Sequence, residues 1–155
     1  MNAAAKFAIE ILGIHCLIFH DVDLFPQNDG NYYACSHAKN AAWHIGGYVD
    51  SLNYEIWYHH LVGGVASITV ENYLRINGYS NLFWGWGGED DDFGYRLVAN
   101  DIRIERPDLS VGKMTMLSHV HRTRSAPSEI FSLLKTSKER WKVDGINNTQ
   151  WIIKK

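Results

Sequence analysis

The length, composition and charge of the chain limit what it can be. Its 155 residues, 46% of them hydrophobic, are enough to enclose one core and too few to suggest two independent domains. The chain has 15 basic and 17 acidic residues and no block rich in Lys or Arg, so we expect no nucleic-acid partner. No apolar run in the sequence is long enough to span a bilayer.

The amino-terminal residues predict a helix followed by a strand. Apolar residues recur at helical spacing between residues 3 and 12, and Gly13 is placed to end that helix. Charged residues interrupt this stretch, so it has no signal-peptide core and we expect no targeting segment in it. The apolar run from Cys16 to Phe19 then predicts a strand that stops at Asp21-Val22-Asp23. The acidic triplet is therefore expected at the carboxyl end of a strand, where ligands bind in open α/β sheets.

The rest of the pattern predicts one α/β or α+β domain over residues 1–155, with a single layer of sheet and flanking helices. The paired glycines of Val62-Gly63-Gly64-Val65 indicate backbone that passes close to another group, because glycine weakens a strand. Thr69 is expected to cap a short helix over residues 70–77. A half-buried strand is predicted at residues 101–105, and Ser128 is expected to open an amphipathic helix.

Asp21-Val22-Asp23 is the first candidate site. In an extended segment the two carboxylates lie on the same side, as needed to hold a hard divalent cation against a diphosphate. Such triplets also occur by chance, and for this one alone a solvated turn is the simpler explanation.

The run Trp84-Gly85-Trp86-Gly87-Gly88-Glu89-Asp90-Asp91-Asp92 is the second candidate site. Its four consecutive acids repel one another, so the fold must offset that repulsion. An acidic first helical turn, stabilised by the helix dipole, explains the acids but not the Trp and Gly residues. A carbohydrate site explains both, because glycines let backbone approach a sugar, Trp offers a stacking face, and carboxylates accept hydrogen bonds from hydroxyls. One of the acids could serve as a general base.

The third candidate pairs Met116 with His119. For either residue alone, a core methionine or a surface histidine is the simpler explanation. Beside the acidic triplet, their thioether and imidazole are candidate ligands for a transition metal such as manganese. Composition also leaves the state of Cys16 and Cys35 open, with two free thiols slightly favoured over a disulfide by base rates.

Together these motifs resemble a known family. In chain order they are the strand ending in Asp21-Val22-Asp23-Leu24, then Gly63-Gly64-Val65, Ile76-Asn77-Gly78, the run from Trp84 to Asp92, Arg106-Pro107, Val111-Gly112-Lys113, and Met116 with His119. They resemble the catalytic domain of the β-1,4-galactosyltransferase family, glycosyltransferase family 7, from about its middle nearly to its end. The resemblance implies a GT-A-like mixed sheet with flanking helices that lacks part of the amino-terminal nucleotide-binding half.

The resemblance also implies a mechanism and its residues. Asp23, Met116 and His119 would coordinate manganese on the diphosphate of a UDP-sugar. Asp90 would be the general base, with Glu89 beside it in the catalytic set. The donor would contact Asp21, Val22, Asp23, Leu61, Gly64 and Trp86. An acceptor ending in N-acetylglucosamine would contact Trp86, Gly87, Gly88, Asp90, Asp91, Phe131 and Leu134. The transfer would invert the donor sugar to a β-1,4 linkage.

One departure from the family pattern concerns the donor. Leu61 stands where galactose-specific members have Tyr, and the space beside the donor's second carbon favours N-acetylgalactosamine, as in the invertebrate enzymes. Galactose is the alternative donor, and a catalytically incomplete carbohydrate-binding fragment is the alternative class. The family also implies a disulfide between Cys16 and Cys35 and, for the intact protein, a type II membrane protein of the Golgi lumen whose anchor this chain lacks.

Overall fold

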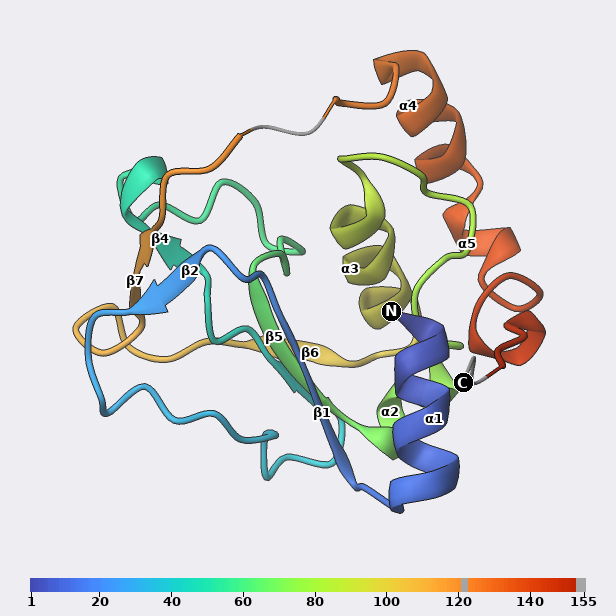
Figure 1. Ribbon diagram of the computed structural model, residues 1–155, viewed down its shortest axis with the longest axis horizontal. Helices are drawn as coiled ribbons and strands as arrows, with labels where there is room; N and C mark the ends of the chain where they lie inside the picture. The colour runs from blue at the N-terminus through green and yellow to red at the C-terminus, as the bar shows by residue number, and fades with distance from the viewer. Residues whose placement is uncertain (121–122, 153–155) are drawn as a thin grey trace.

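The computed structural model describes residues 1–120 and 123–152, which form helices around two small sheets (Figure 1). The helices are α1 (Asn2–Leu12), α2 (Val70–Arg75), α3 (Glu89–Ala99), α4 (Pro127–Lys135) and α5 (Ser137–Arg140), with 3-10 turns η1 (Asp50–Leu52) and η2 (Ile146–Asn148). The strands are β1 (Cys16–His20), β2 (Leu24–Pro26), β3 (Ala41–Trp43), β4 (Tyr48–Val49), β5 (Val65–Thr69), β6 (Arg103–Glu105) and β7 (Lys113–Met116).

The larger sheet is mixed, with the strand order β1-β5-β3-β6. Strand β5 runs antiparallel to both β1 and β3, whereas β3 and β6 are parallel. The expectation of a single layer of sheet was wrong, because β2, β7 and β4 form a second, three-stranded sheet. The separation occurs after β1, where the Leu24 N–H donates to the Asp21 carbonyl at 3.2 Å and the chain turns away to pair with β7.

The main core lies between the larger sheet and helices α1 to α3. Its centre is a cluster of aromatic rings, in which Tyr79 stacks on Phe93 of α3 with centroids 4.1 Å apart and planes 9° from parallel. Phe19 of β1 and Tyr73 of α2 pack around this pair. The cluster fixes α3 against the end of β1, and so determines where the acidic first turn of that helix lies.

Local sequence signals were confirmed at two helix ends and failed at a third. Helix α1 ends at Gly13, which has a left-handed φ of 62°. Thr69 Oγ1 accepts a hydrogen bond from Asn72 N at 3.3 Å, although α2 ends at Arg75, two residues earlier than expected. Ser128 does not open α4, which begins at Pro127 without a side-chain cap. Proline suits the first helical turn because its missing N–H would have no partner there.

Cys16 and Cys35 form a disulfide, as the family resemblance implied. Their Cα atoms are 5.8 Å apart, within the usual range for such a bond. The bridge ties β1 to the loop that precedes β3. Among residues 1–120 and 123–152, no helix has the length and apolar character that crossing a membrane requires.

Candidate active site

Three segments meet at the carboxyl end of β1. The Asp21 N–H donates to the Gly64 carbonyl at 2.9 Å, which joins the acidic triplet to the glycine pair. A Cβ on Gly63 would lie 2.7 Å from Oδ2 of Asp90, so only glycine allows this backbone to touch the first turn of α3. The structure thus brings together Asp21, Gly63, Gly64 and Asp90, from three separate motifs of the sequence.

Asp90 has the most strongly perturbed carboxyl group at this edge. Its pKa is raised to about 7, mainly by burial and then, in decreasing order, by the charges of Glu89, Asp21 and Asp91. The pKa of Asp21 is also raised, first by burial and then by Asp23 and Glu89. Carboxylates crowded in this way attract a cation or hold a proton. A carboxyl with a pKa near 7 is suited to accept a proton at neutral pH.

The four consecutive acids of α3 have four different environments. Glu89 accepts a hydrogen bond from Gly87 N at 3.0 Å, and Asp91 accepts one from the Tyr58 hydroxyl. Asp90 faces Gly63, whereas Asp92 is fully buried. The helix N-terminus, which follows Gly88, stabilises all four negative charges. The predicted repulsion is therefore offset by hydrogen bonds or ion pairs at Glu89, Asp91 and Asp92, whereas at Asp90 it remains and raises the pKa.

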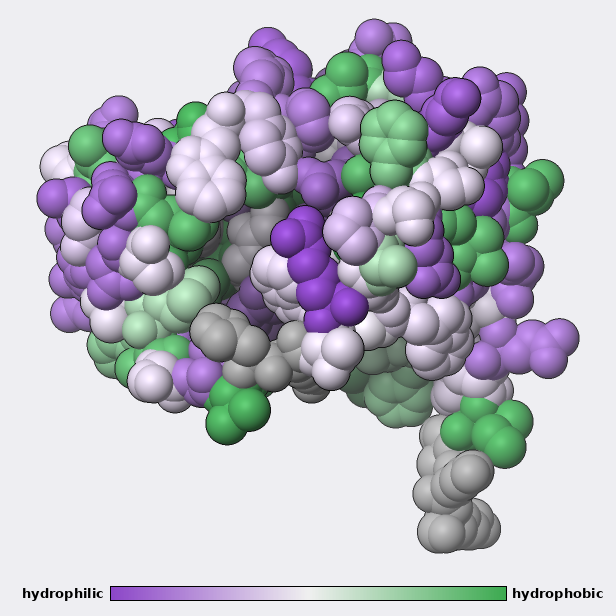
Figure 2. Space-filling model, turned by 90° about the horizontal axis from the view of Figure 1, so that it is seen from above, coloured by the Kyte–Doolittle hydropathy of each residue, from purple (hydrophilic) through white to green (hydrophobic). Residues whose placement is uncertain are grey.

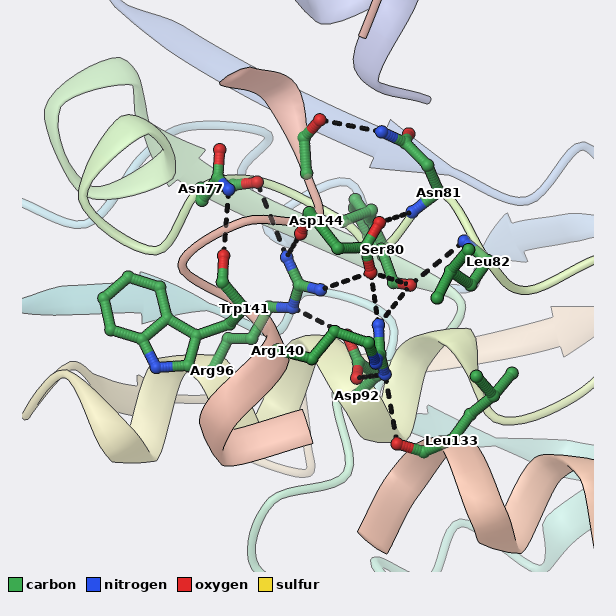
Figure 3. A network of polar contacts seen from close by, with 12 residues as sticks. Asn77, Ser80, Asn81, Leu82, Asp92, Arg96, Leu133, Arg140, Trp141 and Asp144 are labelled. Atoms are coloured by element: carbon green, nitrogen blue, oxygen red, sulfur yellow. Dashed lines mark hydrogen bonds and ion pairs between the residues drawn. The ribbon is translucent and has the colours of Figure 1, made fainter. Parts of the chain in front are cut away.

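Asp92 belongs to a buried ion network rather than to the site (Figure 3). Its two oxygens lie 2.6 Å from Arg96 Nε and 2.9 Å from Arg140 Nη2. Asp144 joins both arginines, and Arg140 also donates to the Leu133 carbonyl of α4 at 3.0 Å. The network joins α3 to α4 and α5. Sequence reasoning missed it, although the spacing of Asp92 and Arg96 by four residues on a helix was a usable signal.

The residues expected to bind metal converge at the start of the second sheet. His119 Nε2 lies 2.9 Å from Asp23 Oδ2, and Leu117 N donates to the Asp23 carbonyl at 2.7 Å. Met116 pairs with Leu24 across the β2–β7 register, one residue beyond Asp23. No group of three His, Cys, Asp or Glu side chains within the described ranges could hold a metal ion, so a metal held by Asp23 and His119 would need another kind of donor, such as the Met116 thioether. A carboxylate, an imidazole and a thioether together fit a transition metal.

The triplet itself departs from expectation. Asp21 and Asp23 were expected on one side of an extended segment, but a turn at Val22 and Asp23 separates their roles. Asp21 interacts with the acids of α3, whereas Asp23 interacts with His119. Val22 is 97% exposed between them. The Leu24 to Asp21 hydrogen bond that closes the turn is the physical reason.

Asp50 is a further residue of this region that sequence reasoning missed. Its Oδ1 accepts a hydrogen bond from Met116 N at 2.9 Å, and this bond is the main reason that the pKa of Asp50 is lowered. Ser51, the next residue, donates from Oγ to the Met116 sulfur at 3.4 Å. The turn η1 therefore holds both the backbone and the side chain of Met116.

The tryptophans of the Trp-Gly run face solvent. Trp84 is 82% and Trp86 is 53% exposed, and the guanidinium of Arg124 lies 5.3 Å from the Trp86 ring centroid. Ser125 N donates to the Trp86 carbonyl at 3.2 Å, which joins this loop to the segment before α4. In Figure 1 the orange chain after β7 crosses over the top of the molecule toward α4. Seen from above, hydrophobic residues on this face are scattered among hydrophilic ones, as suits a polar ligand (Figure 2).

Helix α4, which carries the expected acceptor residues Phe131 and Leu134, packs against that loop through Ile130. Ile130 is buried, and a Cβ on Gly88 would lie 2.6 Å from its Cγ2 atom. Gly87 is also in reach of Ile130. Phe131, the next residue, is 69% exposed, and Leu134 is partly buried. The glycines thus have a packing role against α4 as well as any role toward a sugar.

Comparison with known proteins identifies the family. Residues 44–120 match the family model described as the N-terminal domain of galactosyltransferase, and residues 1–36 match the model of the N-terminal region of glycosyl transferase group 7. The chain belongs to the β-1,4-galactosyltransferase family. The matched residues include Asp21, Asp23, Leu61, Asp90, Met116 and His119, whereas Phe131 and Leu134 lie beyond both regions.

Curated members of the β-1,4-galactosyltransferase family are similar over nearly the whole chain. β-1,4-Galactosyltransferase 6 of Rattus norvegicus is 41% identical over 147 residues, which are 95% of this chain and 38% of the rat protein. β-1,4-Galactosyltransferase 5 of Sus scrofa is 39% identical over 150 residues, which are 97% of this chain and 38% of the pig protein. The chain thus spans 38% of the length of these two relatives.

Solved structures of the family share the fold. The catalytic domain of Drosophila β-1,4-galactosyltransferase 7 in complex with xylobiose aligns with a TM-score of 0.75 at 23% identity, covering 99% of this chain and 66% of that one. A mutant of the same enzyme, in complex with manganese, UDP-Gal and xylobiose, aligns with a TM-score of 0.76 at 25% identity, covering 99% and 64%. The predicted GT-A-like mixed sheet with flanking helices is confirmed.

Proposed function

We propose that the intact protein transfers a galactose-type sugar from UDP to a terminal N-acetylglucosamine, with inversion to a β-1,4 linkage. The observation that carries the proposal is the position of Asp90. It lies at a carboxylate-rich edge between the acidic turn and the glycine pair, with a pKa raised to about 7. The relatives named as β-1,4-galactosyltransferases and the Drosophila complex with manganese and UDP-Gal support the reaction class.

In this proposal Asp90 accepts the proton of the acceptor hydroxyl as that oxygen attacks the donor sugar from the side opposite UDP. Glu89 holds the loop before α3 through its bond to Gly87 N, and so belongs to the catalytic set. Asp23, Met116 and His119 would hold manganese, which would supply positive charge beside the departing UDP. Membership of the metal set is supported by the 2.9 Å approach of His119 to Asp23.

The substrates are assigned to the two sides of Asp90. On the donor side we place Asp21, Val22, Asp23, Leu61, Gly64 and Trp86. On the acceptor side we place Trp86, Gly87, Gly88, Asp90, Asp91, Phe131 and Leu134. The exposed ring of Phe131 offers an apolar contact for the acetyl group of N-acetylglucosamine. The disulfide supports a secretory compartment, and we propose the Golgi lumen.

Leu61 favours N-acetylgalactosamine as the donor sugar. A tyrosine at this position would crowd the substituent on the donor's second carbon, and leucine leaves room for an acetamido group. Galactose is the second candidate, because the relatives reported above are named galactosyltransferases.

A donor panel tests the proposal on a catalytic domain of the relatives' length that contains this chain. With manganese and an N-acetylglucosamine acceptor, we expect UDP-N-acetylgalactosamine to exceed UDP-galactose in kcat/KM by roughly tenfold to a few hundredfold, the usual range for one pocket group. Leu61→Tyr should shift the ratio toward UDP-galactose.

The matched control is Leu74→Tyr at an exposed leucine of α2, which should leave the donor ratio unchanged. If the unmutated enzyme prefers UDP-galactose, or if Leu61→Tyr leaves the ratio in place, the galactosyltransferase proposal replaces this one. Glycan binding without transfer from any donor would instead identify a carbohydrate-binding fragment.

A further inference from the structure

A buried histidine and an arginine lie directly behind the donor side of the site. His44 is 1% exposed, and its Nε2 donates to the Gly63 carbonyl at 2.7 Å. Its other nitrogen, Nδ1, accepts a hydrogen bond from Arg106 Nε at 3.1 Å. Burial, and then the charge of Arg106, lower the pKa of His44 to about 4. At neutral pH the ring is therefore uncharged and carries its one proton on Nε2, where Gly63 accepts it.

Arg106 continues the same set of contacts. Its Nη2 atom donates to the His59 carbonyl at 3.0 Å and to the Leu61 carbonyl at 2.7 Å. The guanidinium thus binds a neutral ring and two backbone carbonyls, and it has no carboxylate partner among residues 1–120 and 123–152. A planar fork with five donors in fixed directions can make these contacts together, whereas an ammonium group cannot.

The fold brings the two side chains together for a simple reason. His44 follows β3 and Arg106 follows β6, and these parallel strands are paired through Trp43 and Glu105. The His44 N–H donates to the Glu105 carbonyl at 2.8 Å, which extends the pairing by one residue. The two strands therefore end at the same level and present both side chains to residues 59–63.

The other side of residues 59–63 is closed by α3. A Cβ on Gly94 would lie 2.1 Å from the His60 carbonyl oxygen, so helix and loop are in direct contact. Gly63 meets Asp90 in the same way. The segment is thus held between the catalytic helix and the pair of side chains, and its course decides where Leu61 and Gly63 lie.

We propose that His44 and Arg106 are positioning residues, which fix the backbone of residues 59–63 and thereby hold Leu61 beside the donor and Gly63 against Asp90. This inference rests on the proposed function for its effect on donor use, but not for its effect on the loop. Neither residue touches the reacting atoms. Their loss should therefore change donor binding and selectivity before it changes acceptor binding.

Paired substitutions separate this role from a general effect on folding. His44→Gln keeps one donor and one acceptor, whereas His44→Leu removes both. Arg106→Lys keeps the positive charge and loses the planar guanidinium with its several N–H donors. With the enzyme of the donor panel, we expect kcat/KM for the UDP-sugar to fall by roughly tenfold to a hundredfold in His44→Leu and Arg106→Lys, as for lost hydrogen bonds to a charged or buried group. His44→Gln should recover most of that loss, and KM for the acceptor should change by less than about twofold.

Arg103→Lys is the control, because Arg103 lies on the same strand with a side chain that is 72% exposed. It should leave all kinetic values unchanged. The inference would be overturned if kcat/KM fell equally for the donor and the acceptor. It would also be overturned if the Arg106→Lys variant folded and its donor kinetics were unchanged.

Amide hydrogen exchange of the 155-residue chain gives a readout that needs no activity. Exchange should become faster in residues 59–64 of Arg106→Lys and His44→Leu and stay unchanged in the second sheet, because local opening is separate from global unfolding. Faster exchange throughout the chain, or an unchanged exchange rate in residues 59–64, would contradict the positioning role. If the unmutated enzyme transfers no sugar while exchange changes as expected, the proposed function fails and the positioning of the loop stands.

Discussion

At the scale of single residues, Asp90 combines an environment suited to catalysis with a cost to stability. Its pKa of about 7 lies above the ordinary 3.8, because burial and three neighbouring carboxylates disfavour the charge. Below about pH 4 the group is protonated in both the folded and unfolded states, and ionisation costs nothing. Between about pH 4 and pH 7 the unfolded state releases this proton while the folded state keeps it, so stability falls as the pH rises across this window and levels off above pH 7.

We expect Asp90→Asn to lower turnover by roughly a hundredfold or more while donor affinity stays nearly intact, since the substitution removes only the proton acceptor. The unmutated enzyme should gain activity with rising pH up to about 7, where Asp90 ionises.

Thermal unfolding of the same variant supplies a second measurement. Asp90→Asn should melt at a higher temperature than the unmutated chain at pH 8 and at a similar one at pH 4. Lower stability at pH 8, or an equal loss of donor affinity, would make Asp90 a structural acid.

At the scale of elements, the proposed metal site depends on two segments that meet by strand pairing. The turn after β1 supplies Asp23, and the end of β7 supplies Met116 and, three residues later, His119. Asp50 of η1 fixes the Met116 backbone from the other side. The placement of the three proposed ligands therefore depends on the second sheet, which was not expected from the sequence.

We expect Asp23→Ala to abolish manganese binding, measured by electron paramagnetic resonance titration, and manganese-dependent turnover with it. His119→Ala should weaken binding more than Met116→Ala, because imidazole is the stronger ligand. Asp29→Ala, at an acid outside the set, is the control and should bind manganese as before. Unchanged binding in Asp23→Ala, or a larger loss in Met116→Ala than in His119→Ala, would show that the ligand set is assigned incorrectly.

At the scale of the whole molecule, the buried network of Asp92, Arg96, Arg140 and Asp144 joins α3, which carries the proposed base, to α4 and α5, the proposed acceptor side (Figure 3). Arg96 is 1% exposed and Asp92 is fully buried. Removing one charge from such a network leaves its partners buried and uncompensated. The stability of the acceptor side and that of α3 are therefore coupled.

Asp92→Asn should lower the free energy of unfolding by about 3–5 kcal/mol, the range for breaking a buried ion pair. Urea denaturation at neutral pH measures this, with Glu10→Gln as control because Glu10 is exposed on α1 and its substitution should cost about 0.5 kcal/mol or less. A similar small loss of unfolding free energy in both variants would mean that water replaces the missing charge in the network. Asp92→Asn and Asp90→Asn should thus differ, the first acting on stability and the second on turnover.

The sequence by itself determined the local elements and the motifs that identify the family. Helical spacing with Gly13 predicted α1, Thr69 predicted the cap of α2, and the Trp-Gly-acid run marked the start of α3. These predictions succeeded because each depends on residues close in the chain, where spacing and capping act directly.

Only the tertiary structure decided which acids face one another and which are buried. It placed Asp92 in a buried ion network and Asp90 beside Gly63 and near Asp21. It also placed Asp23 within 2.9 Å of His119. It also brought His44 and Arg106 together from strands 62 residues apart. The pairing of His44 with Arg106 has no signal in the sequence, because burial and charge interactions depend on contacts between distant segments, and these are fixed when the sheets and helices pack.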